Sequence, residues 1–363
     1  MRKLVALSGA LDSLPTGWLH HSVQTVAGHR VHFAIAEAME PDFDPQAEEN
    51  REMVLVRVKG FSLNYRDKGI IFTTGRTAEG AAIGSEFVGE VIACGSQVSS
   101  LQAGQRVIAE MAWPSNGSRG TLGGVPTNAA SIEFQVFHQA KLVRIPEAMP
   151  EAVAASFALG AQTVYSMVRR LNLGPDDNVL VTAASSNTSL FALQALKKSG
   201  ANVHAVTTNC NTQSKLHDLN IQQVIIVKDG DFTEAIRTAR SLGGFDVVID
   251  PFADIYLPQL ARTMAFFGRY VTCGVADQGY STSTPDPCPA FAEWMTQLIV
   301  RNVKLIGNCL GLKQDLEAAI QDWEDRTFDI AIDSTYTNGQ IGEFIHRTYN
   351  AADRFGKVVY LYS

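Results

Sequence analysis

The sequence lacks any pair of cysteines spaced for a shared metal ion or an obvious disulfide. Its cysteines are five in number and lie far apart, at Cys94, Cys210, Cys273, Cys288 and Cys309. The C-x-x-C pair that is typical of structural zinc sites does not occur. This spacing argues against a disulfide framework, and it predicts reduced cysteines and a cytoplasmic location.

Long apolar runs and basic runs are also missing. No apolar segment approaches the roughly 20 residues that a membrane-spanning helix needs. The short apolar stretch that begins at Leu4 ends at Asp12, so we expect a first strand there and no signal peptide. The net charge of −7 is spread along the chain, which argues against nucleic acid or a membrane as partner. We expect a small-molecule substrate.

The 363 residues are 46% hydrophobic and 18% charged, enough to bury two cores. Up to about residue 155 the chain is rich in β-branched runs that alternate or are bounded by glycine. From about Ser156, short apolar runs alternate with helical or loop segments, which is typical of a doubly wound parallel sheet in an α/β fold. The expected strands of this second part are 179–182, 203–206, 224–227, 247–250, 269–272 and 303–306.

Two segments of the strand-rich part carry a familiar pattern. They read Phe61-Ser-Leu-Asn-Tyr-Arg-Asp67 and Gly84-Ser-Glu-Phe-Val-Gly-Glu-Val91. Together they resemble the catalytic-domain signature of the medium-chain dehydrogenase/reductase superfamily, and the resemblance extends to about Tyr360. It implies a GroES-like, partly open β-barrel catalytic domain over residues 1–158 and 309–363. The same resemblance implies a Rossmann nucleotide-binding domain over residues 159–308.

The zinc ligands of that superfamily's metal enzymes are replaced in these segments. The resemblance places a cysteine ligand near Asn64 and a histidine ligand at Ser85, and neither replacement is a good zinc ligand. We therefore expect no metal, which closes the Lewis-acid route to polarising a substrate. The chain resembles the zinc-independent quinone oxidoreductase and enoyl reductase branch, whose members carry a similar Asn-Tyr-(Lys/Arg)-Asp string.

The glycines that usually bind pyrophosphate are missing too. In the zinc-free reductases the turn after the first Rossmann strand reads like Gly-Ala-x-Gly-Gly-Val-Gly, and here it reads Ala183-Ala-Ser-Ser-Asn-Thr-Ser189. Small hydrogen-bonding residues at a helix start bind phosphate oxygens or cap free N–H groups. We predict that this turn binds the cofactor; the alternative is an ordinary helix cap with no ligand. The predicted contacts are Ser185, Ser186, Asn187 and Thr188.

The end of the second Rossmann strand favours NADPH over NADH. An NAD-preferring fold places Asp or Glu there to bind the ribose 2′-hydroxyl, whereas this chain has Thr207, Thr208 and Asn209. Hydroxyls at this place, with Lys215 as a point charge, suit a 2′-phosphate. Lys215 is equally compatible with a solvated helix residue.

Further cofactor contacts follow from the resemblance alone. Thr163 occupies the place of a threonine that lies near the nicotinamide in similar reductases. Gly274 and Val275 end the strand that borders the nicotinamide, and Asn308 and Phe355 fall in segments that often line the cofactor cleft. Each has a structural alternative: Thr163 would then cap or pack a helix, and Gly274 would make a turn.

The resemblance points to Tyr65 and Asn64 as the catalytic pair. A phenol stays protonated at neutral pH, so Tyr65 can donate a hydrogen bond or a proton to an enolate, and Asn64 neighbours the nicotinamide or substrate. The alternative for Tyr65 is an aromatic residue packed between domains. Arg66 and Asp67 are interpreted as a local ion pair or cap.

Three functions remain in competition. We favour an NADPH-dependent, zinc-independent reductase of an activated C=C bond in an enone, enoyl thioester or quinone. An imine or ketone reductase, or a dehydrogenase of a biosynthetic metabolite, is the second, and a non-catalytic binding module on the same fold is the third. We expect a homodimer that pairs the sheet edge at 303–306. The Gly/Asn/Ser/Pro-rich segment 111–133 either shapes substrate access or is a surface loop.

Overall fold

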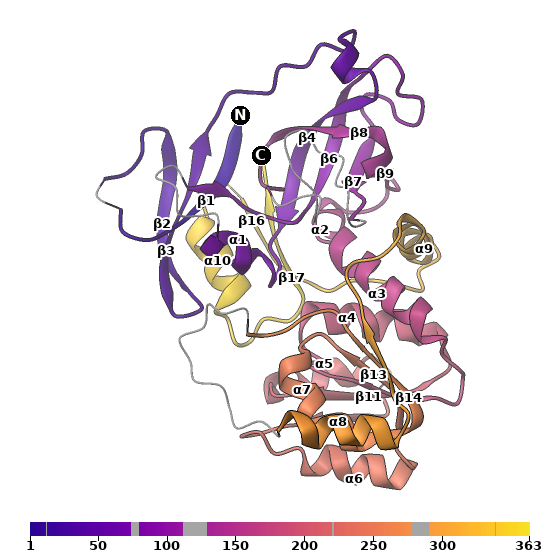
Figure 1. Cartoon of the computed structure of the whole chain (residues 1–363). Coiled ribbons are helices and arrows are strands. Elements are labelled where there is room, and N and C mark those ends of the chain that lie inside the picture. Colours follow the sequence, from indigo (N-terminus) through magenta and orange to yellow (C-terminus); the bar gives the residue numbers. More distant parts are fainter. Residues whose placement is uncertain (12, 74–79, 112–128, 220, 278–289, 338) are drawn as a thin grey trace. The chain divides into compact units, whose positions relative to one another are not determined.

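The computed structural model describes residues 1–11, 13–73, 80–111, 129–219, 221–277, 290–337 and 339–363. Most of the segment 111–133 lies outside these residues. The chain divides into two compact units (Figure 1). Unit 1 comprises Met1–Leu159 and Ile332–Ser363, and the described residues from Gly160 to Ala331 belong to unit 2.

The second boundary differs from the sequence-based one, because residues 309–331 belong to unit 2 rather than to the catalytic domain. The reason lies in α9 (Lys313–Glu324), which is bonded to α3 (Ala158–Leu171). Arg169 Nε donates to Asp315 Oδ1 over 2.7 Å, and the Tyr165 hydroxyl donates to Asp322 Oδ2 over 2.7 Å. These contacts join segments about 150 residues apart, which no local pattern reveals.

Unit 1 contains two β-sheets. The first has the strand order β2-β3-β1-β5, and the second has the order β16-β17-β4-β6-β7-β9 with β8 paired to β4. In β4 buried and half-buried residues alternate, as the apolar pattern of Met53–Lys59 predicts. The strands are β1 (Arg2–Ser8), β2 (Trp18–Val26), β3 (His29–Glu37), β4 (Met53–Ser62), β5 (Ala81–Ala82), β6 (Glu86–Cys94), β7 (Arg106–Ala109), β8 (Phe134–His138), β9 (Leu142–Arg144), β16 (Ile332–Thr337) and β17 (Lys357–Leu361).

Helix α10 (Ile341–Tyr349) packs on the sheets of unit 1 through an aromatic cluster. The Phe344 ring meets Phe61 of β4 edge-on at a centroid distance of 5.8 Å, and Tyr360 of β17 lies 5.4 Å from Phe61. Burying such large rings supplies much of the packing energy of a small core. The cluster ties β17 to β4 next to the candidate site. The other helices of this unit are α1 (Asp67–Thr73) and α2 (Glu151–Ala154).

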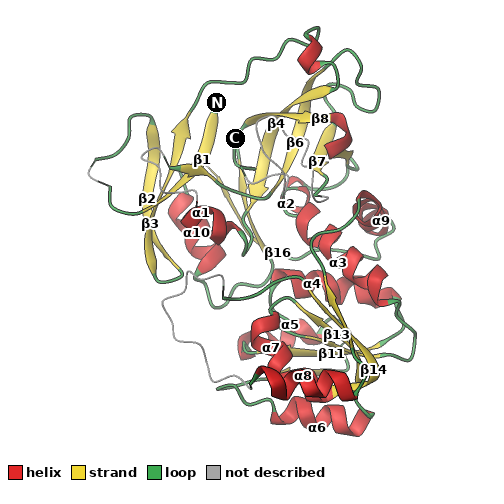
Figure 2. Ribbon diagram, in the orientation of Figure 1, coloured by secondary structure: helices red, strands yellow, loops and turns green. Residues whose placement is uncertain are grey.

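Unit 2 is built on one parallel sheet with helices on both sides, such as α4 and α8 (Figure 2). Its order, β12-β11-β10-β13-β14-β15, is that of the doubly wound nucleotide-binding fold, with a switch point between β10 and β13. The strands are β10 (Asn178–Val181), β11 (Asn202–Thr207), β12 (Gln223–Ile226), β13 (Phe245–Asp250), β14 (Met264–Thr272) and β15 (Lys304–Gly307), and the other helices are α4 (Asn187–Ala195), α5 (Gln213–His217), α6 (Thr233–Leu242), α7 (Ala253–Leu260) and α8 (Phe291–Val300).

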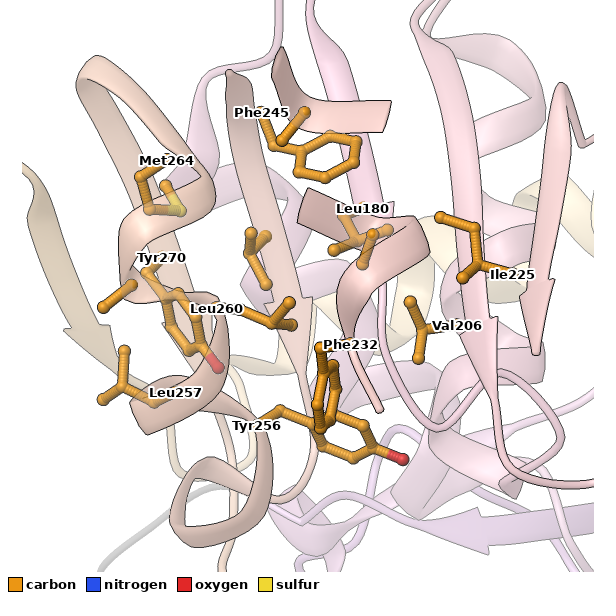
Figure 3. Packing of buried hydrophobic residues seen from close by; sticks show 14 of the residues in the cluster. Leu180, Val206, Ile225, Phe232, Phe245, Tyr256, Leu257, Leu260, Met264 and Tyr270 are labelled. Atoms are coloured by element: carbon orange, nitrogen blue, oxygen red, sulfur yellow. The ribbon is translucent and has the colours of Figure 1, made fainter. Parts of the chain in front are cut away.

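One core of unit 2 lies between the sheet and the helices that follow β12 and β13. Figure 3 shows Phe232 and Tyr256 close together, with Leu180 and Val206 of the sheet nearby. Tyr270 of β14 is fully buried there. Together the two units confirm the predicted fold class, a GroES-like domain and a Rossmann domain.

Among the described residues, no helix combines the length and the apolar character that crossing a bilayer requires.

Candidate functional site

A buried polar cluster forms in unit 1 where three strand ends meet. Strand β4 ends at Ser62, which lies opposite Glu86 at the start of β6 and Val359 of β17. Strand β17 begins with Lys357, so its side chain enters the same place. The sequence therefore puts a hydroxyl, a carboxylate and an ammonium group together through strand register.

Lys357 lies at the centre of this cluster. Its side chain is 1% exposed and that of Glu86 is fully buried. The ammonium Nζ donates to Glu86 Oε1 over 2.5 Å, to Asn64 Oδ1 over 2.7 Å and to Ser62 Oγ over 3.4 Å. The other oxygen of Glu86 accepts the backbone N–H of Leu159 over 2.9 Å. An ammonium has three N–H donors, and these three contacts match them in number.

Asn64 joins this ion pair to Ser85 and Asp67. Its amide nitrogen donates to Glu86 Oε1 over 2.8 Å and to Ser85 Oγ over 3.1 Å. Ser85 donates in turn to Asp67 Oδ2 over 2.8 Å, which also accepts the backbone N–H of Asn64 over 2.6 Å. Burial raises the pKa of Asp67, because the charged form is poorly solvated. Both amide hydrogens of Asn64 thus have acceptors within unit 1.

Tyr65 differs from its buried neighbours because its side chain reaches solvent, with 39% of the residue exposed. The ammonium of Lys68 lies over its ring, 4.0 Å from the centroid, and 5.7 Å from the centroid of Tyr349. A cation over a ring face is attracted by the ring's negative charge density. Burial lowers the pKa of Lys68. An accessible phenol next to a cation is suited to donating a hydrogen bond to an anionic intermediate.

In unit 2 the predicted phosphate-binding turn follows β10 and leads into α4. Ala183 has a φ of +44°, in the left-handed region that favours glycine. The Ser186 N–H donates to Ala183 O over 2.7 Å, and Ser186 Oγ accepts the N–H of Ser189 over 3.3 Å as the N-cap of α4. Asn187 and Thr188 form the first turn of that helix. Small side chains and a helix N-terminus at the end of the first strand fit a bound pyrophosphate.

The predicted pyrophosphate and ribose contacts are brought together. Ser185 Oγ lies 3.3 Å from Thr207 Oγ1, which also accepts the Asn209 N–H over 3.1 Å. Thr208 and Lys215, in the loop and helix that follow β11, are exposed. The hydroxyls that the sequence assigns to a 2′-phosphate therefore lie at the end of the second strand, and Lys215 lies in the helix that follows.

A second group of predicted residues meets at Asn308. Its amide nitrogen donates to the carbonyl oxygens of Thr163 (3.4 Å) and Leu310 (2.8 Å), and its backbone N–H donates to Thr272 at the end of β14. Gly274 follows that strand, and a Cβ there would stand 2.8 Å from the carbonyl oxygen of Pro251, so the chain needs glycine. Val275 is 45% exposed.

Phe355 belongs to unit 1, where its N–H donates to Asp333 Oδ1 over 2.9 Å. The other predicted cofactor contacts belong to unit 2.

Sequence reasoning missed a buried carboxylate next to the predicted phosphate-binding turn. Asp250, at the end of β13, accepts hydrogen bonds from Thr182 Oγ1 at 2.6 Å, from the Phe252 N–H at 2.9 Å and from the hydroxyl of Tyr270. The carbonyl of Thr182 accepts from Ser189 Oγ over 2.6 Å, which connects Asp250 to α4. Burial raises the pKa of Asp250 to about 6.

Lys357 was also missed. Its only sequence signal is a lysine directly after Gly356 at the head of an apolar closing strand.

Comparison with known proteins gives two family matches. A model described as "Alcohol dehydrogenase GroES-like domain" matches residues 50–147, and one described as "Zinc-binding dehydrogenase" matches residues 188–360. The chain is 24% identical over 316 residues to acryloyl-coenzyme A reductase of Metallosphaera sedula, covering 82% of this chain and 86% of that protein.

Larger and solved proteins are similar as well. The chain is 25% identical over 225 residues to a mycocerosic acid synthase-like polyketide synthase of Mycobacterium tuberculosis; the match covers 61% of this chain and only 10% of that protein. The crystal structure of CurK enoyl reductase superposes with a TM-score of 0.71 at 20% identity, over 99% of this chain and all of that one. That likeness shows the fold.

The zinc named in one family description does not fit the cluster of unit 1. Protein zinc sites use thiolates, imidazoles and carboxylates, whereas Asn64 and Ser85 offer a carboxamide and a hydroxyl. The ammonium of Lys357 contacts Glu86 and so adds a positive charge where a metal would need a negative one. In the part of the chain that the structure describes, no three His, Cys, Asp or Glu side chains are grouped to hold a metal ion.

Proposed function

Because the chain belongs to the medium-chain dehydrogenase/reductase superfamily, we propose that it is an NADPH-dependent, zinc-independent reductase that transfers hydride to an activated C=C bond. The acceptor class is an enone, an enoyl thioester or a quinone. The observation that carries the proposal is the buried cluster around Lys357. Its Asn64 and Ser85 are poor zinc ligands, and Asn64 directly precedes the accessible Tyr65.

The NADPH preference rests on the end of β11. Thr207, Thr208 and Asn209 stand where an NAD-binding fold has a carboxylate for the ribose 2′-hydroxyl. Lys215 follows in α5 with an exposed side chain. A 2′-phosphate would gain hydroxyl donors and a positive charge there, without meeting a carboxylate.

The bound nicotinamide would supply the hydride. Addition to a conjugated alkene places negative charge on the carbonyl oxygen, and the reaction ends with a proton on the α-carbon. Tyr65 is the group that we assign to donate this hydrogen bond or proton, since its ring is accessible and Lys68 lies over it. Asn64 would neighbour the nicotinamide or the substrate. Its backbone N–H donates to Asp67 and its side-chain oxygen accepts from Lys357, so the cluster holds it in position.

The acceptor class is supported by the relatives. The acryloyl-coenzyme A reductase matches over most of both chains, and its name describes reduction of an enoyl thioester. The CurK structure is named an enoyl reductase.

Calorimetric titration with NADPH and NADH tests the cofactor proposal first. We expect micromolar binding of NADPH and at least tenfold weaker binding of NADH. Heat from neither cofactor at millimolar concentration would contradict the reductase and favour a binding module on the same fold.

Loss of NADPH absorbance with acryloyl-coenzyme A, simple enones and quinones tests the acceptor. Replacing Tyr65 by Phe should lower kcat by about a hundredfold, the range for a general acid, while NADPH affinity stays unchanged. Tyr336→Phe, in β16, is the matched control and should retain turnover. Equal turnover of the two variants would remove Tyr65 from the mechanism.

We also propose a homodimer through β15. This strand ends the sheet order of unit 2, and its Leu305 is 46% exposed. An exposed edge strand of this kind pairs readily with the same strand of a second copy. Light scattering should give twice the chain mass, and Leu305→Lys should give the monomer. A monomeric parent protein would remove the proposal.

A further inference from the structure

The position of Lys357 has a consequence for metal binding. Its ammonium is 1% exposed and contacts one carboxylate, one carboxamide oxygen and one hydroxyl. An ammonium buried in this way is tolerable only when it is paired and hydrogen-bonded. The three contacts meet that requirement, so the side chain of Lys357 supplies the positive charge of the cluster.

The same contacts decide which way the Asn64 carboxamide faces. The carboxamide oxygen accepts from Lys357, so the carboxamide nitrogen faces Ser85 and Glu86. A metal ion on this side would therefore meet N–H groups, which do not bind metals. Both oxygens of Glu86 accept hydrogen bonds, Oε1 from Lys357 and Oε2 from the Leu159 N–H.

One strong acceptor in the cluster remains without a hydrogen bond. Asp67 is fully buried, and its Oδ1 has no hydrogen-bond donor; the guanidinium of Arg66 stands 3.8 Å away. The cluster thus has two buried carboxylates, Asp67 and Glu86, and Lys357 neutralises the second. Without that ammonium, the two carboxylates would draw a cation into the cluster.

We propose that Lys357 takes the place of a divalent metal ion in this cluster: its ammonium keeps zinc out, and removing its charge opens the cluster to a divalent cation. The inference rests on the zinc-independent part of the proposed function. It is tested by metal binding, whereas the reductase is tested by NADPH titration and turnover, so the two fail separately.

The first test compares the parent protein with Lys357→Met, each stripped of metal and titrated with Zn²⁺ by calorimetry and with Co²⁺ by visible absorbance. We expect Lys357→Met to bind one equivalent at least tenfold more tightly than the parent. Lys141→Met is the matched control, because it breaks another largely buried lysine–glutamate pair, Lys141 with Glu110. It should bind metal no better than the parent. One tightly bound equivalent in the parent protein, removed by Glu86→Gln, would overturn the proposal.

A double variant keeps the test valid if Lys357→Met does not fold. Asn64→Cys with Ser85→His provides two good zinc ligands while Lys357 stays. We expect this double variant to bind zinc weakly, because the ammonium of Lys357 still lies in the cluster. Tight zinc binding by the double variant would show that the lysine does not exclude the metal and would overturn the proposal.

Discussion

Glu86 in unit 1 and Asp250 in unit 2 are both buried carboxylates at strand ends, but different kinds of hydrogen-bond donor contact them. Glu86 has an ammonium group 2.5 Å away. Asp250 has two hydroxyls and one backbone N–H, from Thr182, Tyr270 and Phe252. The first carboxylate is thus balanced by a full positive charge and the second only by dipoles.

The two arrangements have different consequences for the stability of the protein. Neutral donors do not fully replace water, so burial raises the pKa of Asp250 to about 6 despite three hydrogen bonds. An ion pair keeps a carboxylate charged, but it makes each partner dependent on the other. Unit 1 should therefore be sensitive to mutation of its pair, and unit 2 should be sensitive to pH.

The largest expected effect comes from breaking the ion pair. Lys357→Met leaves Glu86 buried without a counter-charge, which should lower the free energy of unfolding by about 3–5 kcal/mol. The double variant Glu86→Gln/Lys357→Met removes both charges and should recover most of that loss. Urea denaturation of the three proteins at pH 7.5 measures both effects. An unchanged Lys357→Met would mean that water reaches Glu86.

The second expected effect is a pH dependence from Asp250. Its pKa is 3.8 in an ordinary environment and about 6 in the fold, so the folded state holds the proton to a higher pH. The stabilising contribution is complete below pH 3.8 and is lost as the pH rises through about 6. Two pKa units correspond to about 3 kcal/mol.

Denaturation between pH 4 and pH 8 measures this effect in the parent and in Asp250→Asn. The free energy of unfolding of the parent should fall as the pH rises through about 6, and that of Asp250→Asn should not show this fall. Asp246→Asn is the control, because Asp246 lies on the same strand and accepts the Asn178 N–H over 2.9 Å. Parallel pH profiles for the parent and Asp250→Asn would show that Asp250 does not titrate in this range.

Much of the fold follows from local sequence, because each strand of unit 2 is an apolar run between turn residues. The run 179–182 becomes β10 (Asn178–Val181), and 303–306 becomes β15 (Lys304–Gly307). The placement of residues 309–331 does not follow, since it depends on Arg169 and Asp315, which are 146 residues apart. Contacts of this range leave no periodic pattern.

The candidate site divides in the same way. The turn with Ser185 and Ser186 lies after a strand and before a helix, as the local sequence indicates, and its phosphate binding stays a prediction. The pair Lys357 and Glu86 does not, because its members are 271 residues apart and only strand register joins them. Asp250 is visible as the last residue of an expected strand, but the hydroxyl of Tyr270 that bonds it lies on the neighbouring strand.

The smallest expected effect concerns the turn that rests on the Asp250 network. Ala183 has a φ of +44°, which costs an L-residue roughly 1–2 kcal/mol. Glycine removes that cost but adds about 0.5–1 kcal/mol of chain entropy to the unfolded state, so Ala183→Gly should stabilise the protein by about 0.5–1 kcal/mol in thermal unfolding. Ala184→Gly is the control, because Ala184 is fully buried and gains no conformational relief, and it should lose stability. Equal losses of stability in both variants would mean that Ala183 adopts its positive φ without strain.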